Sequence, residues 1–179
     1  MHKTFNSNTN LYLIGPMGAG KSSIGLKLAE LIQRPFYDSD HEIEKRCGVS
    51  ISWIFEKEQE IGFRHREVLI IQELCQLSGV VLSTGGGTIL NPQTQSLLKN
   101  TGIIIYLEVS LPEQVARTLF RKNARPLLQE NPAEKLAKLN QDRKIIYEGL
   151  ADITVLTDQQ NPLTIAQKIE KQLQCLAQH

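Results

Sequence analysis

The feature that most constrains the fold is a glycine-rich stretch between a short apolar run and a helical pattern. Residues 15–22 read Gly-Pro-Met-Gly-Ala-Gly-Lys-Ser and fit the pattern G-x-x-x-x-G-K-[ST]. An apolar run at 11–14 precedes them, and apolar residues at helical spacing follow over 24–32. A strand, such a loop and a helix in this order are typical of a site for the phosphates of a nucleoside triphosphate. The alternative, a chance match in a glycine-rich turn, is made rarer by that context.

The same stretch predicts how the phosphates would be held. Glycines let backbone N–H groups turn inward on the phosphates, and the N-terminus of the following helix adds a partial positive charge. Lys21 would reach the β- and γ-phosphates, and Ser22 would offer its hydroxyl to Mg²⁺.

The order of the remaining elements predicts an α/β fold. Five short, largely apolar runs alternate with helical patterns, as expected for strands that are buried on both faces of a parallel sheet. We expect strands at residues 11–14, 35–37, 80–82, 103–107 and 153–156, and helical segments at 24–32, 40–77, from 91, from 112, around 143 and from 161 to 176. The predicted architecture is a three-layer sandwich with a five-stranded parallel sheet.

Length and composition predict one globular domain over residues 1–179. The chain is long enough to bury a core, with 41% hydrophobic and 22% charged residues and a formal net charge of +1. Lys and Arg are spread without a dense basic run, so we expect no nucleic-acid partner. No stretch approaches the roughly 20 apolar residues of a membrane span, so we expect no membrane partner. Without a sustained heptad pattern or an extra apolar face, we expect a monomer.

The cysteines and the N-terminus bear on the compartment. Cys47, Cys75 and Cys175 are odd in number and far apart, which indicates neither a disulfide framework nor a zinc site. A reduced, cytoplasmic setting fits best. Residues 1–9 lack the apolar stretch of a signal peptide and are expected to form a flexible tail.

Carboxylates follow the second predicted strand. Asp38 and Asp40 would sit at the carboxyl end of that strand, the edge where open α/β sheets bind ligands. One carboxylate could hold hydrated Mg²⁺ while the other orients an acceptor hydroxyl and takes its proton. The alternative is helix capping by Ser39 or Asp40, which the sequence leaves equally open.

Three consecutive glycines, Gly85, Gly86 and Gly87, follow the third predicted strand. They carry a large backbone entropy cost unless the chain must approach something closely, and a ligand packed on bare backbone is the favoured reason. A plain tight turn is the alternative.

Arg64 and Arg66 lie two positions apart in a helical stretch and cannot share one face, so at most one points into the site. A surface ion pair is the alternative for either arginine.

A turn-rich segment at about 121–131 predicts a mobile lid. Arg117, Arg121 and Arg125 cluster around it, and a guanidinium carried by a closing lid can neutralise charge on a transferring phosphoryl group. An exposed basic loop is the alternative for any one of them.

Taken together, the chain resembles bacterial shikimate kinases from about residue 11 to residue 173. The matching stretches are GPMGAGKSSIG at 15–25, FYDSD at 36–40, EIGFRHRE at 60–67, STGGG at 83–87, ARPLL at 124–128 and DRKIIYEGLAD at 142–152. The resemblance implies a nucleoside monophosphate kinase-like P-loop fold with a mobile lid. It also implies transfer of the γ-phosphoryl group of ATP to the 3-hydroxyl of shikimate, which gives shikimate 3-phosphate and ADP in aromatic amino acid biosynthesis.

The resemblance also implies roles for individual residues. The catalytic residues would be Lys21, Asp40 and Arg125. ATP would be bound by Gly18, Ala19, Gly20, Lys21, Ser22, Ser23, Arg117 beside the adenine, Arg125 and Gln160. Mg²⁺ would be held by Ser22 directly and by Asp38 through water, and shikimate by Asp40, Arg64, Gly85, Gly86, Gly87 and Arg143.

The sequence departs from the family pattern at Gln59, where the family often has glycine, and we expect this change to be neutral. Two other functions stay open at this point. One is another P-loop small-molecule kinase, such as a gluconate kinase or a nucleoside monophosphate kinase, against which the triple glycine argues. The other is a non-catalytic nucleotide-binding regulator, which the joint presence of Lys21, Ser22, Asp40 and Arg125 disfavours.

Overall fold

The computed structural model describes residues 3–119 and 131–177. Its centre is a five-stranded sheet with the order β2-β3-β1-β4-β5, in which every neighbouring pair is parallel. The strands are β1 (Asn10–Ile14), β2 (Phe36–Asp38), β3 (Val81–Ser83), β4 (Gly102–Glu108) and β5 (Ile153–Leu156). The predicted sheet is therefore confirmed, with each strand boundary within one residue of its expected place.

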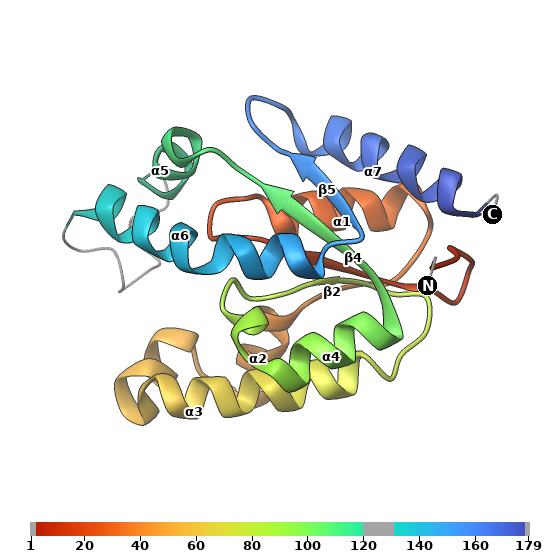
Figure 1. Ribbon diagram of the computed structural model, residues 1–179. Helices are drawn as coiled ribbons and strands as arrows, with labels where there is room; N and C mark the ends of the chain where they lie inside the picture. Colours follow the sequence, from red (N-terminus) through yellow and green to blue (C-terminus); the bar gives the residue numbers. More distant parts are fainter. Residues whose placement is uncertain (1–2, 120–130, 178–179) are drawn as a thin grey trace.

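Helices cover both faces of the sheet (Figure 1). One face carries α1 (Lys21–Leu31) and α7 (Pro162–Ala177). The other carries α2 (Ser39–Cys47), α3 (Ile51–Leu74), the short 3₁₀ helix η1 (Thr88–Leu90), α4 (Pro92–Thr101) and α6 (Pro132–Leu150), while α5 (Leu111–Leu119) follows β4. This is the three-layer sandwich that the sequence predicts.

Strand β1 shows why the strands are apolar at almost every position. Leu11 and Leu13 belong to the core on the side of α1 and α7, whereas Tyr12 and Ile14 belong to the core on the opposite side. All four side chains are fully buried. Side chains alternate between the faces of a strand, so a strand covered on both faces needs apolar residues throughout.

The helical stretch predicted over 40–77 is interrupted, which the sequence analysis did not anticipate. Helix α2 ends at Cys47 and is followed by Gly48, which has a φ of 68°. Helix α3 begins after Ser50, whose hydroxyl accepts a hydrogen bond from the backbone N–H of Trp53 at 3.2 Å. A left-handed glycine after a helix and a serine before the next are common helix boundaries. Helix α3 also bends at Gln59, where φ is 60° and ψ is −173°.

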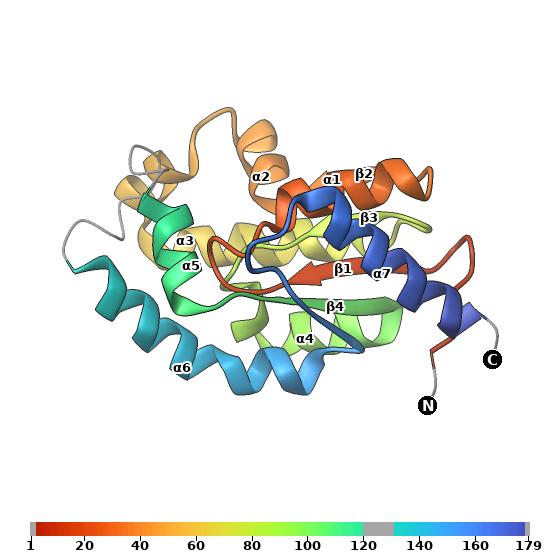
Figure 2. The ribbon, with the colours of Figure 1, turned by 90° about the horizontal axis from the view of Figure 1, so that it is seen from above.

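The parallel register brings three loops to one edge of the sheet. Leu13 pairs with Ser83, and Asp38 pairs with Ser83 from the other side, so β1, β2 and β3 end side by side. In Figure 2 the arrow of β1 points toward the side on which α5 and the start of α6 lie. The segments that follow these strands, which include the glycine-rich loop, the Asp38–Asp40 pair and the triple glycine, therefore meet at this edge.

The N-terminal segment makes more contacts than a detached tail would. The ammonium group of Lys3 donates to the carbonyl oxygen of Gly102 at 2.7 Å and to the carboxylate of Asp152 at 2.6 Å. Arg34 donates to the carbonyl oxygen of Thr9 at 2.5 Å, and its guanidinium lies 4.7 Å from the centre of the Phe5 ring. These contacts argue against free fraying from Lys3 onward, because each ties the segment to the folded body.

Most of the predicted lid lies outside the described residues, since residues 120–130 are not described. Arg121 and Arg125 fall in this gap. Among the helices of residues 3–119 and 131–177, none is long and apolar enough to cross a membrane.

Candidate active site

The glycine-rich loop joins β1 to α1 and has the backbone of an anion-binding loop. Gly18 and Gly20 have φ values of 82° and 90°, which glycine adopts without steric cost. Gly20 directly precedes α1, and no side chain caps that end of the helix. The N-terminus of α1 thus carries the positive end of the helix dipole to this loop, which favours a negatively charged ligand there.

Lys21 lies against this loop. Its ammonium group donates to the carbonyl oxygens of Gly15 at 2.7 Å and Pro16 at 2.9 Å. The contacts hold the positive charge of the lysine beside the N–H groups of the loop. A phosphate bound there would meet both kinds of donor.

Ser22 and Asp38, the two residues that the family resemblance assigns to Mg²⁺, lie in contact. The hydroxyl of Ser22 donates to the carboxylate of Asp38 at 2.5 Å. The described residues contain no group of three or more His, Cys, Asp or Glu side chains that could hold a metal ion by themselves. A hydroxyl and a carboxylate are of the kind that Mg²⁺ uses, since it binds through one or two protein oxygens and takes its other ligands from phosphates and water.

The capping alternative is partly right, but for a different residue. Asp38, rather than Ser39 or Asp40, caps α2, since its carboxylate accepts from the backbone N–H groups of Asp40 at 3.1 Å and His41 at 3.4 Å. Its other carboxylate oxygen faces Ser22. Capping and metal binding are therefore compatible, because the helix end uses one oxygen of Asp38 and leaves the other at the site.

Ser39 has a role that the sequence analysis missed. It is fully buried, and its hydroxyl accepts a hydrogen bond from the backbone N–H of Gly85 at 2.9 Å. This bond ties the triple-glycine loop to the start of α2.

Close approaches of other groups require glycine at positions 85 and 87, whereas a Cβ atom on Gly86 would make only an ordinary contact. A Cβ atom on Gly85 would lie 2.9 Å from the carboxylate of Asp40 and 2.6 Å from that of Glu67. A Cβ on Gly87 would lie 2.6 Å from Cζ of Arg64, and one on Gly86 would lie 3.6 Å from the carbonyl oxygen of Gly15. The expected close approach is present, but the groups that occupy it at Gly85 and Gly87 are side chains of the chain itself.

Arg64 points to this loop and is held by two carboxylates. It donates to Glu67 at 2.7 Å and to Glu60 at 3.0 and 3.2 Å. Burial alone would lower the pKa of the Arg64 guanidinium, but the charges and hydrogen bonds of Glu67 and Glu60 outweigh that effect, and its pKa is raised. Arg66 instead pairs with Glu58 at 2.7 and 3.0 Å. The two arginines thus point in different directions, as their spacing predicts.

Glu67 is the second residue that the sequence analysis did not assign to the site. Its side chain is only 3% exposed and bridges Arg64 and the hydroxyl of Thr88, which donates to it at 2.6 Å. A buried carboxylate needs such partners. Its place three residues after Arg64 in a helix was the available signal, because that spacing puts both on one face.

Gly86 receives two donors from α6. The guanidinium of Arg143 donates to its carbonyl oxygen at 3.2 Å, and the hydroxyl of Tyr147 donates to the same oxygen at 2.6 Å. Tyr147 stacks on Tyr106, with 5.1 Å between the ring centres, and burial raises the pKa of its hydroxyl. The structure thereby brings Arg143 to the same loop as Asp40 and Arg64.

The residues expected on the adenine side lie by the loop after β5, at the same edge of the sheet as the glycine-rich loop. Arg117 pairs with Glu113 at 2.9 Å, donates to the carbonyl oxygens of Thr157 at 2.7 Å and Gly18 at 3.3 Å, and so connects the loop after β5 with the glycine-rich loop. Gln160 lies in the loop after β5 and accepts from Lys168 at 2.6 Å.

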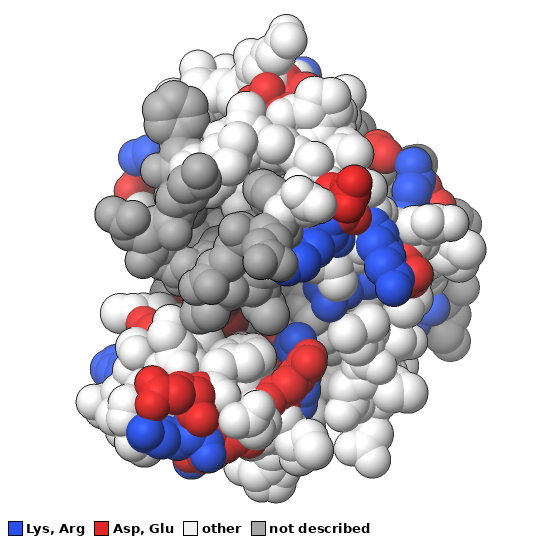
Figure 3. Space-filling view, turned by 90° about the vertical axis from the view of Figure 1, so that its left-hand side faces the viewer, with Lys and Arg blue, Asp and Glu red and all other residues white. Residues whose placement is uncertain are grey.

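Figure 3 shows the face to which the strands point, where basic and acidic side chains lie against one another around a hollow.

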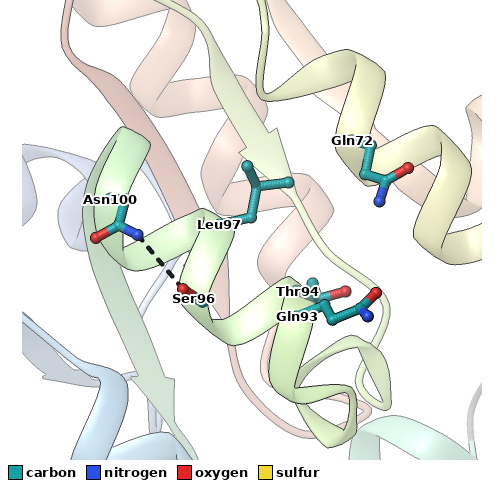
Figure 4. Close-up of a pocket in the computed structure, with 6 residues that line it drawn as sticks. All are labelled: Gln72, Gln93, Thr94, Ser96, Leu97 and Asn100. Carbon is teal, nitrogen blue, oxygen red and sulfur yellow. Dashed lines mark hydrogen bonds between the residues drawn. The ribbon is translucent and has the colours of Figure 1, made fainter.

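A separate cavity of about 430 Å³ lies between α3 and α4, away from the glycine-rich loop (Figure 4). It is lined by Gln72, Gln93, Thr94, Ser96, Leu97 and Asn100. None of these side chains is charged, so the cavity offers nothing to neutralise a triphosphate.

Comparisons with known proteins agree with this geometry. Residues 17–174 match the family model described as shikimate kinase. A shikimate kinase of Shewanella denitrificans is 47% identical over 165 residues, which cover 92% of this chain and 96% of that protein. The structure of shikimate kinase from Acinetobacter baumannii in complex with shikimate matches with a TM-score of 0.91 and 46% identity and covers 96% of both chains. A gluconokinase from Sinorhizobium meliloti, 16% identical with a TM-score of 0.63, shares the fold alone.

Proposed function

The chain belongs to the shikimate kinase family, and from that premise we propose that it transfers the γ-phosphoryl group of ATP to the 3-hydroxyl of shikimate. The products are shikimate 3-phosphate and ADP. The acceptor oxygen forms a bond to the γ-phosphorus, the bond from that phosphorus to the bridging oxygen breaks, and ADP leaves with the electron pair.

The donor side is built from the glycine-rich loop and the start of α1. The backbone N–H groups of 18–23 bind the phosphates, and Lys21 adds a positive charge that balances negative charge on the transferring group. Ser22 and Asp38 hold Mg²⁺, which when bound neutralises phosphate charge. Arg117 and Gln160 lie where the adenine end of ATP is expected. Arg125, outside the described residues, is assigned to ATP by the family resemblance alone.

The acceptor side is built around the triple-glycine loop. Asp40, next to Gly85, orients the acceptor hydroxyl and takes its proton as the new bond forms. Arg64 and Arg143 bind the carboxylate of shikimate, because a guanidinium offers two parallel N–H donors to a carboxylate. Glu67 keeps one edge of Arg64 fixed, which leaves the edge now facing the more exposed Glu60 for the substrate.

One observation carries the proposal: the triple-glycine loop touches both halves of the site. Gly86 lies beside the glycine-rich loop at Gly15, Gly85 lies against Asp40, and Gly87 lies against Arg64. Phosphate-binding and acceptor-binding groups are therefore neighbours, which direct transfer between two bound substrates requires.

We further propose that the protein acts as a monomer in the cytoplasm, without nucleic-acid or membrane partners. The dispersed basic residues and the net charge of +1 support this, as does an odd number of separated cysteines.

A substrate panel tests the function. ADP release would be followed with ATP and Mg²⁺ and, in parallel, shikimate, quinate, gluconate or a nucleoside monophosphate. Shikimate should give the highest kcat/KM. Faster turnover with gluconate or a nucleoside monophosphate would show that the protein is another P-loop kinase. ATP binding without turnover of any acceptor would favour a non-catalytic nucleotide-binding regulator.

A further inference from the structure

Gln114 in α5 is a buried polar residue for which the function described above has no use. Its side chain is 1% exposed, and both ends of its amide are hydrogen-bonded. Its Nε2 atom donates to the carbonyl oxygen of Met17 in the glycine-rich loop at 2.8 Å. Its Oε1 atom accepts from the Nδ2 atom of Asn140 in α6 at 2.7 Å.

The chemistry of the partners determines which way this amide faces. A carbonyl oxygen can only accept, so the end of Gln114 that meets Met17 must be the NH₂ group. The opposite end is then the oxygen, and it needs a donor, which Asn140 supplies. Asn140 therefore orients Gln114, and Gln114 in turn holds the Met17 carbonyl group.

Holding this carbonyl oxygen also determines where the next N–H group points. The C=O of Met17 and the N–H of Gly18 belong to one planar trans peptide, in which they point in opposite directions. Helix α5 packs against the loop at this peptide, since a Cβ atom on Gly18 would lie 3.1 Å from the hydroxyl oxygen of Thr118 and 3.3 Å from Cγ of Gln114. With its carbonyl drawn toward α5, the Met17–Gly18 peptide turns its N–H away from α5 and into the curve of the loop.

A glycine-rich loop needs such support. Gly18 has a φ of 82°, and glycine accepts both signs of φ with similar ease, so the loop itself does little to prevent this peptide from turning over. We propose that Gln114, oriented by Asn140, is a positioning residue that keeps the Gly18 N–H directed at the phosphates of ATP. This inference rests on the proposed role of the 18–23 N–H groups.

The competing explanation is that Gln114 merely satisfies buried polar groups and so contributes only to stability. Binding measurements separate the two, because a purely structural role would lower the melting temperature without changing the affinity of the folded protein for ATP. The thermal midpoint and the dissociation constants of ATP and shikimate would be measured by calorimetry for each variant, together with kcat.

Gln114→Met keeps the length of the side chain and removes both hydrogen bonds. We expect it to weaken ATP binding by about tenfold, the effect of one well-placed hydrogen bond, and to leave shikimate binding within about twofold. Tyr12→Phe is the matched control, since it removes a buried hydroxyl that contacts Thr101 at 2.8 Å, at the opposite edge of the sheet. It should lower the melting temperature and leave both affinities unchanged.

A second pair of variants at the less buried Asn140 keeps the test decisive if Gln114→Met folds poorly. Asn140→Asp places an acceptor opposite Oε1, which favours turning the Gln114 amide over and leaves an oxygen against the Met17 carbonyl. Asn140→Ala removes the partner without that reversal. We expect Asn140→Asp to weaken ATP binding several times more than Asn140→Ala.

Equal ATP affinity in wild type, Gln114→Met and Asn140→Asp would overturn the positioning role and leave the proposed function untouched. Equal losses of ATP affinity in Asn140→Asp and Asn140→Ala would also contradict the positioning role of Gln114. If wild type itself failed to bind ATP, the proposed function would fail first.

Discussion

At the scale of single residues, the candidate site depends on how each charge is neutralised and directed. Arg64 is held on one edge by the buried Glu67 and on the other by the largely exposed Glu60. A substrate carboxylate can therefore replace Glu60 while Glu67 keeps the guanidinium in place. Replacing a buried, paired group costs more than replacing an exposed one, which makes the Glu60 edge the accessible one.

This arrangement predicts strong recognition of the shikimate carboxylate by Arg64 and Arg143. The carboxamide of shikimate should be a much poorer substrate for wild type, since the neutral amide cannot accept the charge-assisted hydrogen bonds that the two guanidinium groups make with a carboxylate. Arg64→Ala and Arg143→Ala should each show a smaller difference in kcat/KM between shikimate and its carboxamide. Arg64→Lys should also lower kcat/KM for shikimate, because an ammonium group cannot reproduce the two parallel N–H donors of a planar guanidinium. The measurement is kcat/KM for both compounds.

The matched control for this measurement is Arg46→Ala, which removes an arginine that pairs with Glu73 on the surface. This variant should discriminate between shikimate and its carboxamide as strongly as wild type does. Equal discrimination in all variants would show that the carboxylate is bound elsewhere, and Arg66 or Arg121 would then be tested.

Gln59 shows a different residue-scale effect. Its φ of 60° and ψ of −173° fall in a region that is almost exclusive to glycine and costs a side chain about 1–3 kcal/mol. The expectation that this departure from the family pattern is neutral therefore needs revision. The bend also lets Glu58 approach Gly62, where a Cβ atom would lie 2.7 Å from Oε2 of Glu58.

Gln59→Gly should raise the free energy of unfolding by about 1 kcal/mol, because relief of strain exceeds the added entropy of the unfolded chain. Gln72→Gly, in the regular part of α3, is the control and should lower it by about 1 kcal/mol. Denaturant unfolding of both variants measures the difference. A loss of stability in Gln59→Gly would mean that the glutamine side chain makes contacts that outweigh its backbone strain.

At the scale of elements, the triple-glycine loop is the junction of the site. It receives Ser39 from α2, the hydroxyl of Tyr147 from α6, and close contacts from α3. A change in this loop should therefore affect the acceptor side more than the overall stability, since the groups around it are the ends of side chains.

Gly87→Ala tests this. The new methyl group would displace the guanidinium of Arg64, so KM for shikimate should rise by about tenfold while the affinity for ATP stays near that of wild type. Gly149→Ala is the matched control in α6, where a Cβ atom meets nothing within 4 Å. It should stabilise the protein by about 0.5–1 kcal/mol and leave the kinetics unchanged. An unchanged KM in Gly87→Ala would separate Arg64 from substrate binding.

Some of these elements could be predicted from sequence because their signals are local. The glycine-rich loop has a fixed spacing, and strands such as β4 are continuous apolar runs. The bend at Gln59 could not, because apolar residues continue at helical spacing across it. The break after α2 has local signals in Gly48 and Ser50, but the helical spacing of apolar residues across them favoured one continuous helix. The partners of Glu67 and Gln114 depend on contacts across 21 and 97 positions, to Thr88 and Met17, which no local pattern encodes.

The sequence also left choices that only the fold resolves. The sequence offers Ser39 and Asp40 as caps, whereas the backbone places Asp38 at the helix end. Arg64 and Arg66 are equally plausible site arginines until the resemblance is considered, and the bend in α3 directs Arg66 to Glu58.

At the scale of the whole molecule, the order of strands explains how one sheet can serve two substrates. Strand β1 lies between β3 and β4, so the loop after β1 lies next to the loop after β3. The donor loop and the acceptor loop are neighbours in space although about 70 residues separate Gly15 from Gly85. Helices α1 and α7 stabilise the sheet from one side, and the residues proposed to bind the acceptor come from the other.

The central claim is direct phosphoryl transfer between two substrates bound at the edge where β1, β2 and β3 end. Product analysis tests this claim most directly. Wild type and Lys21→Ala would be incubated with ATP, Mg²⁺ and shikimate, and phosphorus NMR would quantify ADP and the phosphate ester. Wild type should form shikimate 3-phosphate and ADP in equal amounts, and folded Lys21→Ala should be slower by about a hundredfold or more. Release of inorganic phosphate in place of the ester, or near-normal turnover by Lys21→Ala, would contradict the account.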